Sequence, residues 1–274
     1  MRKVKTFFSI RTTFALLLLA CCTFAYAFEG IETQGYLSVT TSMPNGVQVN
    51  EERCERHTSG SRRDELVVAA LKEQSAFQAL QTEEFDEDKT AKRIAAYWAA
   101  VPRDDPATAA VVSKIIEEWQ TDPKRALAEH WSAAFTSWLM CKAGFSAQEF
   151  KRSLGHRFYI DHALNEPMAA HQVMDAATTL PRPGDIVCAD AASQPSTHTL
   201  AEYRRNKPKL LHCHLVTFVG ADTIQVVGGN VEGKVRLTEI QASRESGASG
   251  LPWSDDRRKG WAWFAVLGLK PGRD

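Results

Sequence analysis

The stretch "HCHLVTFVGADTIQVVGGN", residues 212–230, decides the fold class. It contains two short apolar runs, 212–220 and 223–230, that are separated by only Ala221 and Asp222. Two apolar runs with so short a connection are typical of a tight β-hairpin. The sequence therefore predicts two neighbouring antiparallel strands at this place.

Three further apolar runs flank the hairpin. They are "PGDIVCAD" at 183–190, "KVRLTEI" at 234–240 and "WAWFAVLGL" at 261–269. Together with the hairpin they predict a five-stranded, mostly antiparallel sheet. The polar, Pro-interrupted segment 191–211 is expected to be a long loop that forms a wall of a cleft.

The half of the chain before the sheet has the apolar spacing of helices. Residues 62–80, 92–101 and 104–119 each carry apolar residues at helical intervals, and Asp105 with Pro106 forms a helix start. A further helix is expected from Ser132 to the glycine at 144. Helices followed by an antiparallel sheet are typical of an α+β fold.

The first 27 residues have the pattern of a secretory signal peptide. Basic residues precede an apolar run that ends in Ala25-x-Ala27, which predicts cleavage before Phe28. A second interpretation is a lipoprotein signal with Cys21 as the lipidated residue. The apolar run is too short for a membrane span, so we expect an exported protein, periplasmic or secreted, without a membrane span.

The rest of the chain is expected to divide into three parts. Residues 28–60 lack a sustained period and are expected to be a loosely ordered arm. Residues 61–125 are expected to be a helical region, and residues 126–274 an α+β core.

The charge balance bears on the class of partner. Removal of residues 1–27 takes four of the 33 basic residues and none of the 33 acidic ones, which leaves 29 basic against 33 acidic. A mildly acidic protein is not expected to bind nucleic acid or an anionic membrane surface. No cofactor is expected either.

Four cysteines remain after the signal peptide, namely Cys54, Cys141, Cys188 and Cys213. In an oxidising compartment they allow two disulfides in any of three connectivities. Cys188 and Cys213 lie in two predicted strands and are the first pair to test.

The stretch "EHWSAAFTSWLMCKAGF", residues 129–145, raises a question of chemistry. Ser132 lies at the predicted start of a helix, where free backbone N–H groups stabilise negative charge. A serine nucleophile needs a base and a group that orients the base. His212 and His214 point to the same side of one strand and are the candidate bases, while Asn230 is the candidate orienting residue. The alternative is that Ser132 is only a helix cap.

The histidine pair has a second interpretation. His212 and His214 match a zinc-binding His-x-His pattern, with His156 or Asp190 as a third ligand. No His-Glu-x-x-His or paired Cys-x-x-Cys motif supports a metal site, so a metal is not the favoured prediction.

Several motifs in order carry a resemblance to a known family. The motifs "YW", "WSAAFTSWLMCKAG", "HRFYI", "RPGDIVC", "HCHLV" and "VVGGNV" resemble the bacterial domain of unknown function 2272 family over roughly residues 90–269. That family has a pattern similar to the papain-like NlpC and CHAP group of cell-wall amidases and endopeptidases. The resemblance implies a papain-like fold with serine in place of the catalytic cysteine.

The resemblance also implies roles for individual residues. Ser132 matches the papain-like cysteine, Asn230 matches the residue that orients the base, and the base matches either His214 or His212. Trp131, His156 and Asp185 are expected along the cleft, with Asp185 in a structural turn. The implied activity is hydrolysis of an amide or ester bond, with peptidoglycan peptides as substrates. The alternative is a non-catalytic envelope protein that binds cell-wall fragments or a protein partner through the same cleft.

Overall fold

The computed structural model describes residues 39–42, 48–51, 60–82, 87–122, 129–242, 253–254 and 261–274. The predicted signal peptide, with Cys21, and most of the predicted arm lie outside these residues, as does Cys54. All the described residues belong to one compact unit. Within the described part of the chain, no helix has the length and apolar character needed to cross a membrane.

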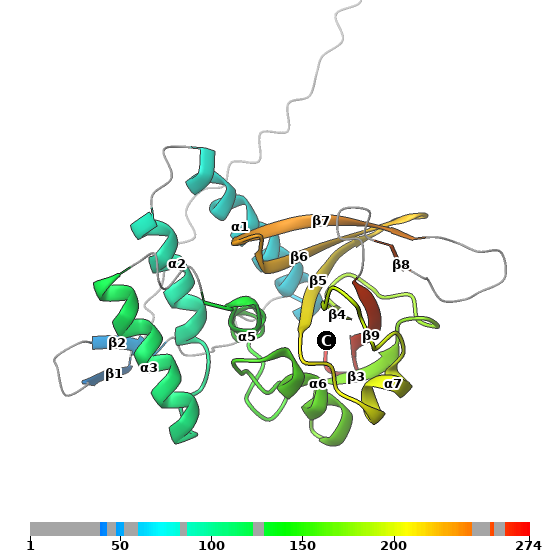
Figure 1. Cartoon of the computed structure of the whole chain (residues 1–274), viewed down its shortest axis with the longest axis horizontal. Coiled ribbons are helices and arrows are strands. Elements are labelled where there is room, and N and C mark those ends of the chain that lie inside the picture. Colours follow the sequence, from blue (N-terminus) through cyan, green and yellow to red (C-terminus); the bar gives the residue numbers. More distant parts are fainter. Residues whose placement is uncertain are drawn as a thin grey trace, which may run out of the picture. The chain divides into compact units, whose positions relative to one another are not determined.

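The main sheet of the described chain is antiparallel throughout. Its strands are β3 (His171–Asp175), β4 (Ile186–Asp190), β5 (Leu211–Val219), β6 (Thr223–Val231), β7 (Lys234–Ala242), β8 (Trp253–Ser254) and β9 (Ala262–Leu269). They lie in the order β3-β9-β4-β5-β6-β7-β8 (Figure 1). Every pair of neighbours is antiparallel. Strands β1 (Val39–Ser42) and β2 (Gln48–Glu51) form a separate two-stranded sheet.

The α+β class is confirmed, and the predicted number of strands was too low. All five predicted runs form strands, and the hairpin between β5 and β6 turns at residues 220–222. The sequence analysis missed β3 and β8, which lie at the two edges of the sheet. Strand β3 has one buried residue in five, because an edge strand needs no continuous apolar face. Such a strand carries no clear alternation in sequence.

The helices pack on the sheet and on one another (Figure 1). They are α1 (Arg62–Thr82), α2 (Glu87–Ala99), α3 (Pro106–Thr121), α5 (Ser132–Lys142), α6 (His156–Asn165) and α7 (Leu200–Arg205). Helix α5 packs on β5 and β6, α1 packs on β5 and β7, and α2 packs on α5. The main hydrophobic core lies between these helices and the sheet.

Two helix starts follow rules that are visible in the sequence. At α3 the side chain of Asp105 accepts a hydrogen bond from the Thr108 backbone, and proline occupies the first turn, as predicted. At α7 the side chains of Thr199 and Glu202 form a capping box. Helix α7 interrupts the segment 191–211 that was expected to be one long loop.

The other face of the sheet has its own core, formed without helical residues. Its buried members come from β4, β5, β6, β7, β9 and the turn after β3. Because side chains from both halves of the sheet meet in this one cluster, the sheet curves around it (Figure 1). The start of β5 lies near the N-terminal ends of α5 and α6.

Cys188 and Cys213, the first pair to test among the open connectivities, are joined by a disulfide. The two residues are directly opposite each other on β4 and β5, and both are buried. Cys141 is also disulfide-bonded. Buried disulfides are typical of proteins in oxidising compartments.

Candidate functional site

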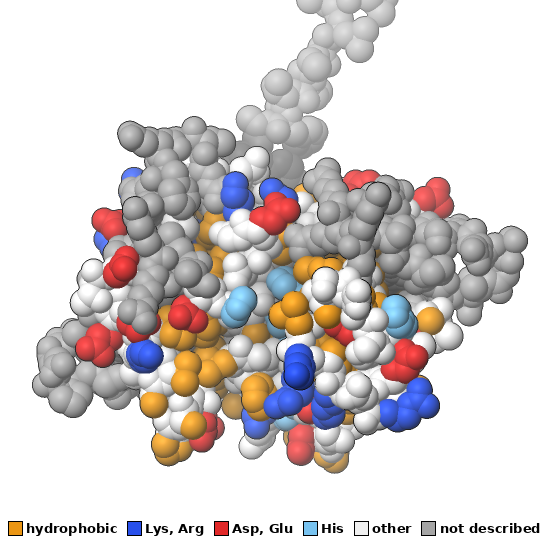
Figure 2. Space-filling model, viewed as in Figure 1, with side chains coloured by type: hydrophobic (Ala, Val, Ile, Leu, Met, Phe, Trp, Pro, Cys, Tyr) orange, Lys and Arg blue, Asp and Glu red, His pale blue; other side chains and the backbone are white. Residues whose placement is uncertain are grey.

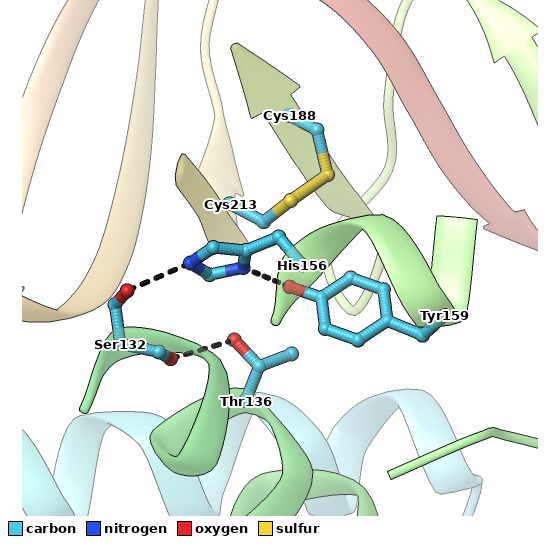
Figure 3. The surroundings of a disulfide bond; sticks show 6 residues. All are labelled: Ser132, Thr136, His156, Tyr159, Cys188 and Cys213. Atoms are coloured by element: carbon cyan, nitrogen blue, oxygen red, sulfur yellow. Dashed lines mark hydrogen bonds between the residues drawn. A yellow bond between two sulfur atoms is a disulfide. The ribbon is translucent and has the colours of Figure 1, made fainter. Parts of the chain in front are cut away.

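Ser132 pairs with a histidine from the next helix. Ser132 is the first residue of α5, and its Oγ lies 2.7 Å from Nε2 of His156, the first residue of α6 (Figure 3). Both side chains are nearly buried, with 8% and 5% of their surfaces exposed. The cap position of α5 is Trp131 and shows no side-chain cap hydrogen bond. The Ser132 hydroxyl is therefore engaged with an imidazole rather than with the helix backbone.

The imidazole of His156 is held on its other side by a tyrosine. Nδ1 of His156 is hydrogen-bonded to the hydroxyl of Tyr159, one helical turn further along α6 (Figure 3). When His156 carries its proton on Nδ1, it donates to Tyr159 and accepts from Ser132. In this arrangement Nε2 can take a proton from the serine hydroxyl.

Burial keeps this group of residues neutral. Desolvation lowers the pKa of His156 to about 3, and burial raises the pKa of Tyr159 above its ordinary value. At neutral pH the imidazole is therefore uncharged and available as a hydrogen-bond acceptor.

The two histidines predicted as bases, His212 and His214, lie one after the other beside the ring of His156, and the serine hydroxyl bonds to His156 instead of to either of them. The ring centroid of His212 is 5.3 Å from that of His156 and 4.9 Å from that of His214. His214 is buried against Trp261 and Trp263, at centroid distances of 5.7 and 5.5 Å. His212 therefore lies between His156 and His214, and His214 is the more deeply placed.

The "GGN" motif has a packing role next to the site. A Cβ atom on Gly228 would lie 2.9 Å from the ring of His214, and one on Gly229 would lie 2.5 Å from Phe135 of α5. These two glycines therefore let the imidazole and the helix approach the backbone of β6 closely.

Asn230 has a left-handed backbone, with φ of 55°, which asparagine tolerates better than most residues. Its side-chain amide donates to the carbonyl oxygen of Glu129 at 3.1 Å. Asn230 thus binds the segment that leads into α5, where the sequence analysis expected it to orient a histidine.

Two residues expected along the cleft lie elsewhere. Trp131 is fully buried and packs against Phe77 and Tyr97. Asp185 accepts hydrogen bonds from Arg63 and from the backbone N–H of Arg182, as expected for a structural turn. His156, the third such residue, is part of the site itself.

A pocket of about 540 Å³ opens beside Ser132. Its lining residues come from the start of α5, the start of α6, the segment after α7 and the ends of β5 and β6: His130, Ser132, Ala133, Leu154, Gly155, His156, Arg157, Phe158, Lys207, Pro208, Lys209, Leu210, Leu211, His212 and Asn230. Ser132, the three histidines His130, His156 and His212, and Asn230 therefore line one space that a ligand can enter.

The zinc-binding interpretation of the histidine pair requires a third ligand close to His212 and His214. Among the described residues, no group of three or more His, Cys, Asp or Glu side chains is arranged to hold a metal ion. The carboxylate of Asp190, once considered as a third ligand, accepts hydrogen bonds from the backbone N–H groups of Ala192, Ser196 and Thr197.

The sequence analysis missed Tyr159 and the pairing of His156 with Ser132. The available signal was the three-residue spacing of His156 and Tyr159 in "HRFYI", which places both on one face of a helix. The pairing itself depends on how α5 and α6 meet, which local sequence does not specify.

Comparison with known proteins places the chain in a family. No curated protein and no solved structure matches it. A family model does match, over residues 86–269, which is about two thirds of the chain. The chain therefore belongs to the bacterial family described as "Uncharacterized protein conserved in bacteria (DUF2272)".

Proposed function

We propose that the protein is an exported hydrolase in which Ser132 attacks an amide or ester carbonyl and His156 acts as the base. The observation that carries this proposal is the 2.7 Å contact between Ser132 Oγ and His156 Nε2 at the wall of a pocket. A serine and a neutral imidazole at this distance form the nucleophile and base of an acyl-transfer site.

The chemistry follows from the positions of these groups. Ser132 Oγ forms a bond to the carbonyl carbon while its proton passes to Nε2 of His156. Tyr159 holds the Nδ1 proton and so fixes the tautomer. The backbone N–H groups in the first turn of a helix have no carbonyl partner within the helix, and those of α5 would stabilise the developing oxyanion. His156 then gives the proton to the leaving group, and water releases the acyl group from Ser132.

This assignment changes the partners that were expected for Ser132. His156 and Tyr159 take the places that His214 or His212 and Asn230 were expected to hold. His212 is the second candidate base, since it lines the same pocket and its ring lies beside His156. Variants of each histidine separate these assignments.

The substrate class and the fold family rest on the sequence resemblance. A nucleophile at a helix start, packed on an antiparallel sheet with histidines on the adjacent strand β5, supports a papain-like fold of the NlpC and CHAP type. Peptidoglycan peptides are the substrates implied by that likeness. The signal-like N-terminus and the buried disulfides support an exported protein.

The test is hydrolysis by purified protein after removal of residues 1–27. Wild type is offered nitrophenyl esters and muropeptides, with Ser132→Ala and Ser137→Ala as matched variants. Ser137 lies in the same helix, and its hydroxyl bonds to the backbone of Ala133 and Ser153, so Ser137→Ala controls for the loss of a buried, hydrogen-bonded hydroxyl. Turnover that disappears in Ser132→Ala and persists in Ser137→Ala supports the proposal. Undiminished turnover in Ser132→Ala refutes it.

A second candidate is a non-catalytic envelope protein that binds a cell-wall fragment in the same pocket. The observation in its favour is the pKa of His156, which desolvation lowers to about 3 and which makes the imidazole a weak base. Saturable binding of muropeptides without turnover, unchanged in Ser132→Ala, favours this candidate over the hydrolase.

A further inference from the structure

The mouth of the Ser132 pocket carries charge of one sign. Arg157 from α6 and Lys207 and Lys209 from the segment after α7 line it, and their side chains are exposed. No Asp or Glu belongs to the lining among the described residues. This local charge contrasts with residues 28–274 as a group, which carry 29 basic against 33 acidic residues, so it is not a consequence of composition.

The three cations are not equivalent. Lys207 forms an ion pair with Asp161 at 2.5 Å, and Asp161 also accepts a hydrogen bond from Tyr203 at 2.9 Å. Lys207 therefore has a carboxylate partner within the protein. Arg157 and Lys209 are absent from the ion pairs found among the described residues. The guanidinium of Arg157 lies over the ring of Phe158, 5.3 Å from its centroid, and this contact leaves its N–H groups able to bind an external anion.

The same pocket has an apolar wall. Leu154, Phe158, Pro208, Leu210 and Leu211 line it, and Phe158 and Leu210 are 44% and 50% exposed. Figure 2 shows hydrophobic side chains beside Lys and Arg side chains over α6 and the segment after α7. Exposed apolar side chains grouped at a pocket are typical of a ligand-binding surface.

We propose that this pocket binds ligands that join a carboxylate to an apolar group, with the carboxylate at Arg157 and Lys209 and the apolar group against Phe158 and Leu210. Guanidinium and ammonium groups bind carboxylates by charge-assisted hydrogen bonds. As a statement about substrates it rests on the proposed function, because Ser132 lies in the same pocket. Binding alone does not require catalysis.

The expected preference for a carboxylate is small because Arg157 and Lys209 are exposed to solvent. Ion pairs in contact with solvent are weak and are screened by salt. Two such contacts are expected to favour a carboxylate over its neutral amide by about threefold to tenfold. The preference should shrink at high ionic strength.

The experiment compares three probes that share one apolar group: phenylbutyrate, phenylbutyramide and phenylbutylamine. Their affinities are measured by ligand-observed NMR on the chain without residues 1–27, at low and at high salt. We expect the acid to bind more tightly than the amide and the amine to bind most weakly. Equal affinity for acid and amide at low salt overturns the proposal.

The variants locate the binding site. Arg157→Gln with Lys209→Gln should abolish the preference for the acid. The matched control is Arg204→Gln with Lys234→Gln, two exposed or half-exposed cations outside the pocket lining, and it should keep the preference. A preference that survives in the first variant overturns the proposal. Thermal melting of each variant verifies that it is folded.

Hydrolysis assays on the same samples separate the two proposals. Selective binding of the acid without any ester or peptide turnover supports the pocket assignment and refutes the hydrolase. Turnover without selectivity for the acid supports the hydrolase and refutes the pocket assignment. When both hold, phenylbutyrate should inhibit turnover competitively, and the amide should do so more weakly.

Discussion

At the residue scale, the site depends on His156, which is buried from solvent. His156 is bonded to Ser132 on one ring nitrogen and to Tyr159 on the other. Because both partners are neutral, nothing in this set of hydrogen bonds requires a charged imidazole. The sequence pointed to Ser132 and to the three histidines, but it did not rank His156 as the partner. His156 is the partner because its Nε2 lies 2.7 Å from Ser132 Oγ, where the starts of α5 and α6 meet.

The burial of His156 predicts the pH dependence of catalysis. The pKa of His156 in the folded protein is about 3, so the base stays unprotonated down to acidic pH. We expect kcat/KM for a nitrophenyl ester to change little between about pH 5 and 8, because this ratio reports ionisation of the free enzyme. A profile that loses half its value near pH 6.5, the ordinary pKa of histidine, contradicts His156 as the base.

His171 provides a separate prediction about stability. It is buried between Phe145 and Phe150, and neither ring nitrogen has a hydrogen-bond partner among the described residues. Burial, assisted by nearby cations, lowers its pKa to about 3. Below pH 6.5 the unfolded chain binds a proton that the folded chain excludes, so stability is complete above pH 6.5 and is lost as the pH falls.

Replacing His171 with leucine should remove this loss. We expect His171→Leu to be neutral or stabilising at pH 7.5, since an unsatisfied buried polar group is removed. At pH 5 it should gain about 1–2 kcal/mol more relative to wild type. Urea unfolding at the two pH values measures the difference, with exposed His198→Leu as the control. An equal effect at both pH values contradicts the assignment.

At the element scale, the contact between α5 and β6 places Ser132. Gly229 lets Phe135 reach the strand, and Asn230 binds the carbonyl of Glu129 just before the helix. The hairpin and α5 were predictable from apolar spacing, because each is a local pattern. Edge strand β3 and helix α6 were not, because tertiary packing decides them. The "GGN" motif was visible in sequence, but its close approach to α5 was not.

The close approach at Gly229 predicts a destabilising substitution. In Gly229→Ala the new Cβ would lie 2.5 Å from the Cβ of Phe135, so strand and helix must separate. We expect a loss of about 1–3 kcal/mol in urea unfolding. In a Phe135→Gly background, which also removes the Cβ of residue 135, the same change should cost less. An equal cost in both backgrounds contradicts the contact.

Asn230 distinguishes packing from catalysis. Asn230→Gly keeps the left-handed backbone accessible and removes the hydrogen bond to Glu129. We expect a loss of about 1 kcal/mol of stability and a kcat within a few-fold of wild type. A fall in kcat of about a hundredfold or more, without a matching fall in stability, restores Asn230 as the residue that orients the base.

At the scale of the whole molecule, the Cys188–Cys213 disulfide ties β4 to β5 beside the site (Figure 3). Its sequence separation is 25 residues, and the enclosed segment includes α7 and part of the pocket wall. A loop of this length predicts about 3 kcal/mol of stabilisation.

Replacement of both cysteines by alanine should therefore lower the melting temperature by several degrees. Calorimetry measures the change, and a reductant should have a smaller effect on the variant than on wild type. A melting temperature equal to that of wild type would contradict a stabilising role for this disulfide.

The pairing of Ser132 with His156 can be tested by the rate at which a fluorophosphonate labels the protein, followed by intact mass. We expect one adduct on wild type, none on Ser132→Ala, and labelling of His156→Gln slower by about a hundredfold or more. His214→Gln, whose ring packs against Trp261 and Trp263, should keep most of the wild-type rate. Labelling of His156→Gln at the wild-type rate, or no labelling of wild type, contradicts the pairing of Ser132 with His156 as nucleophile and base.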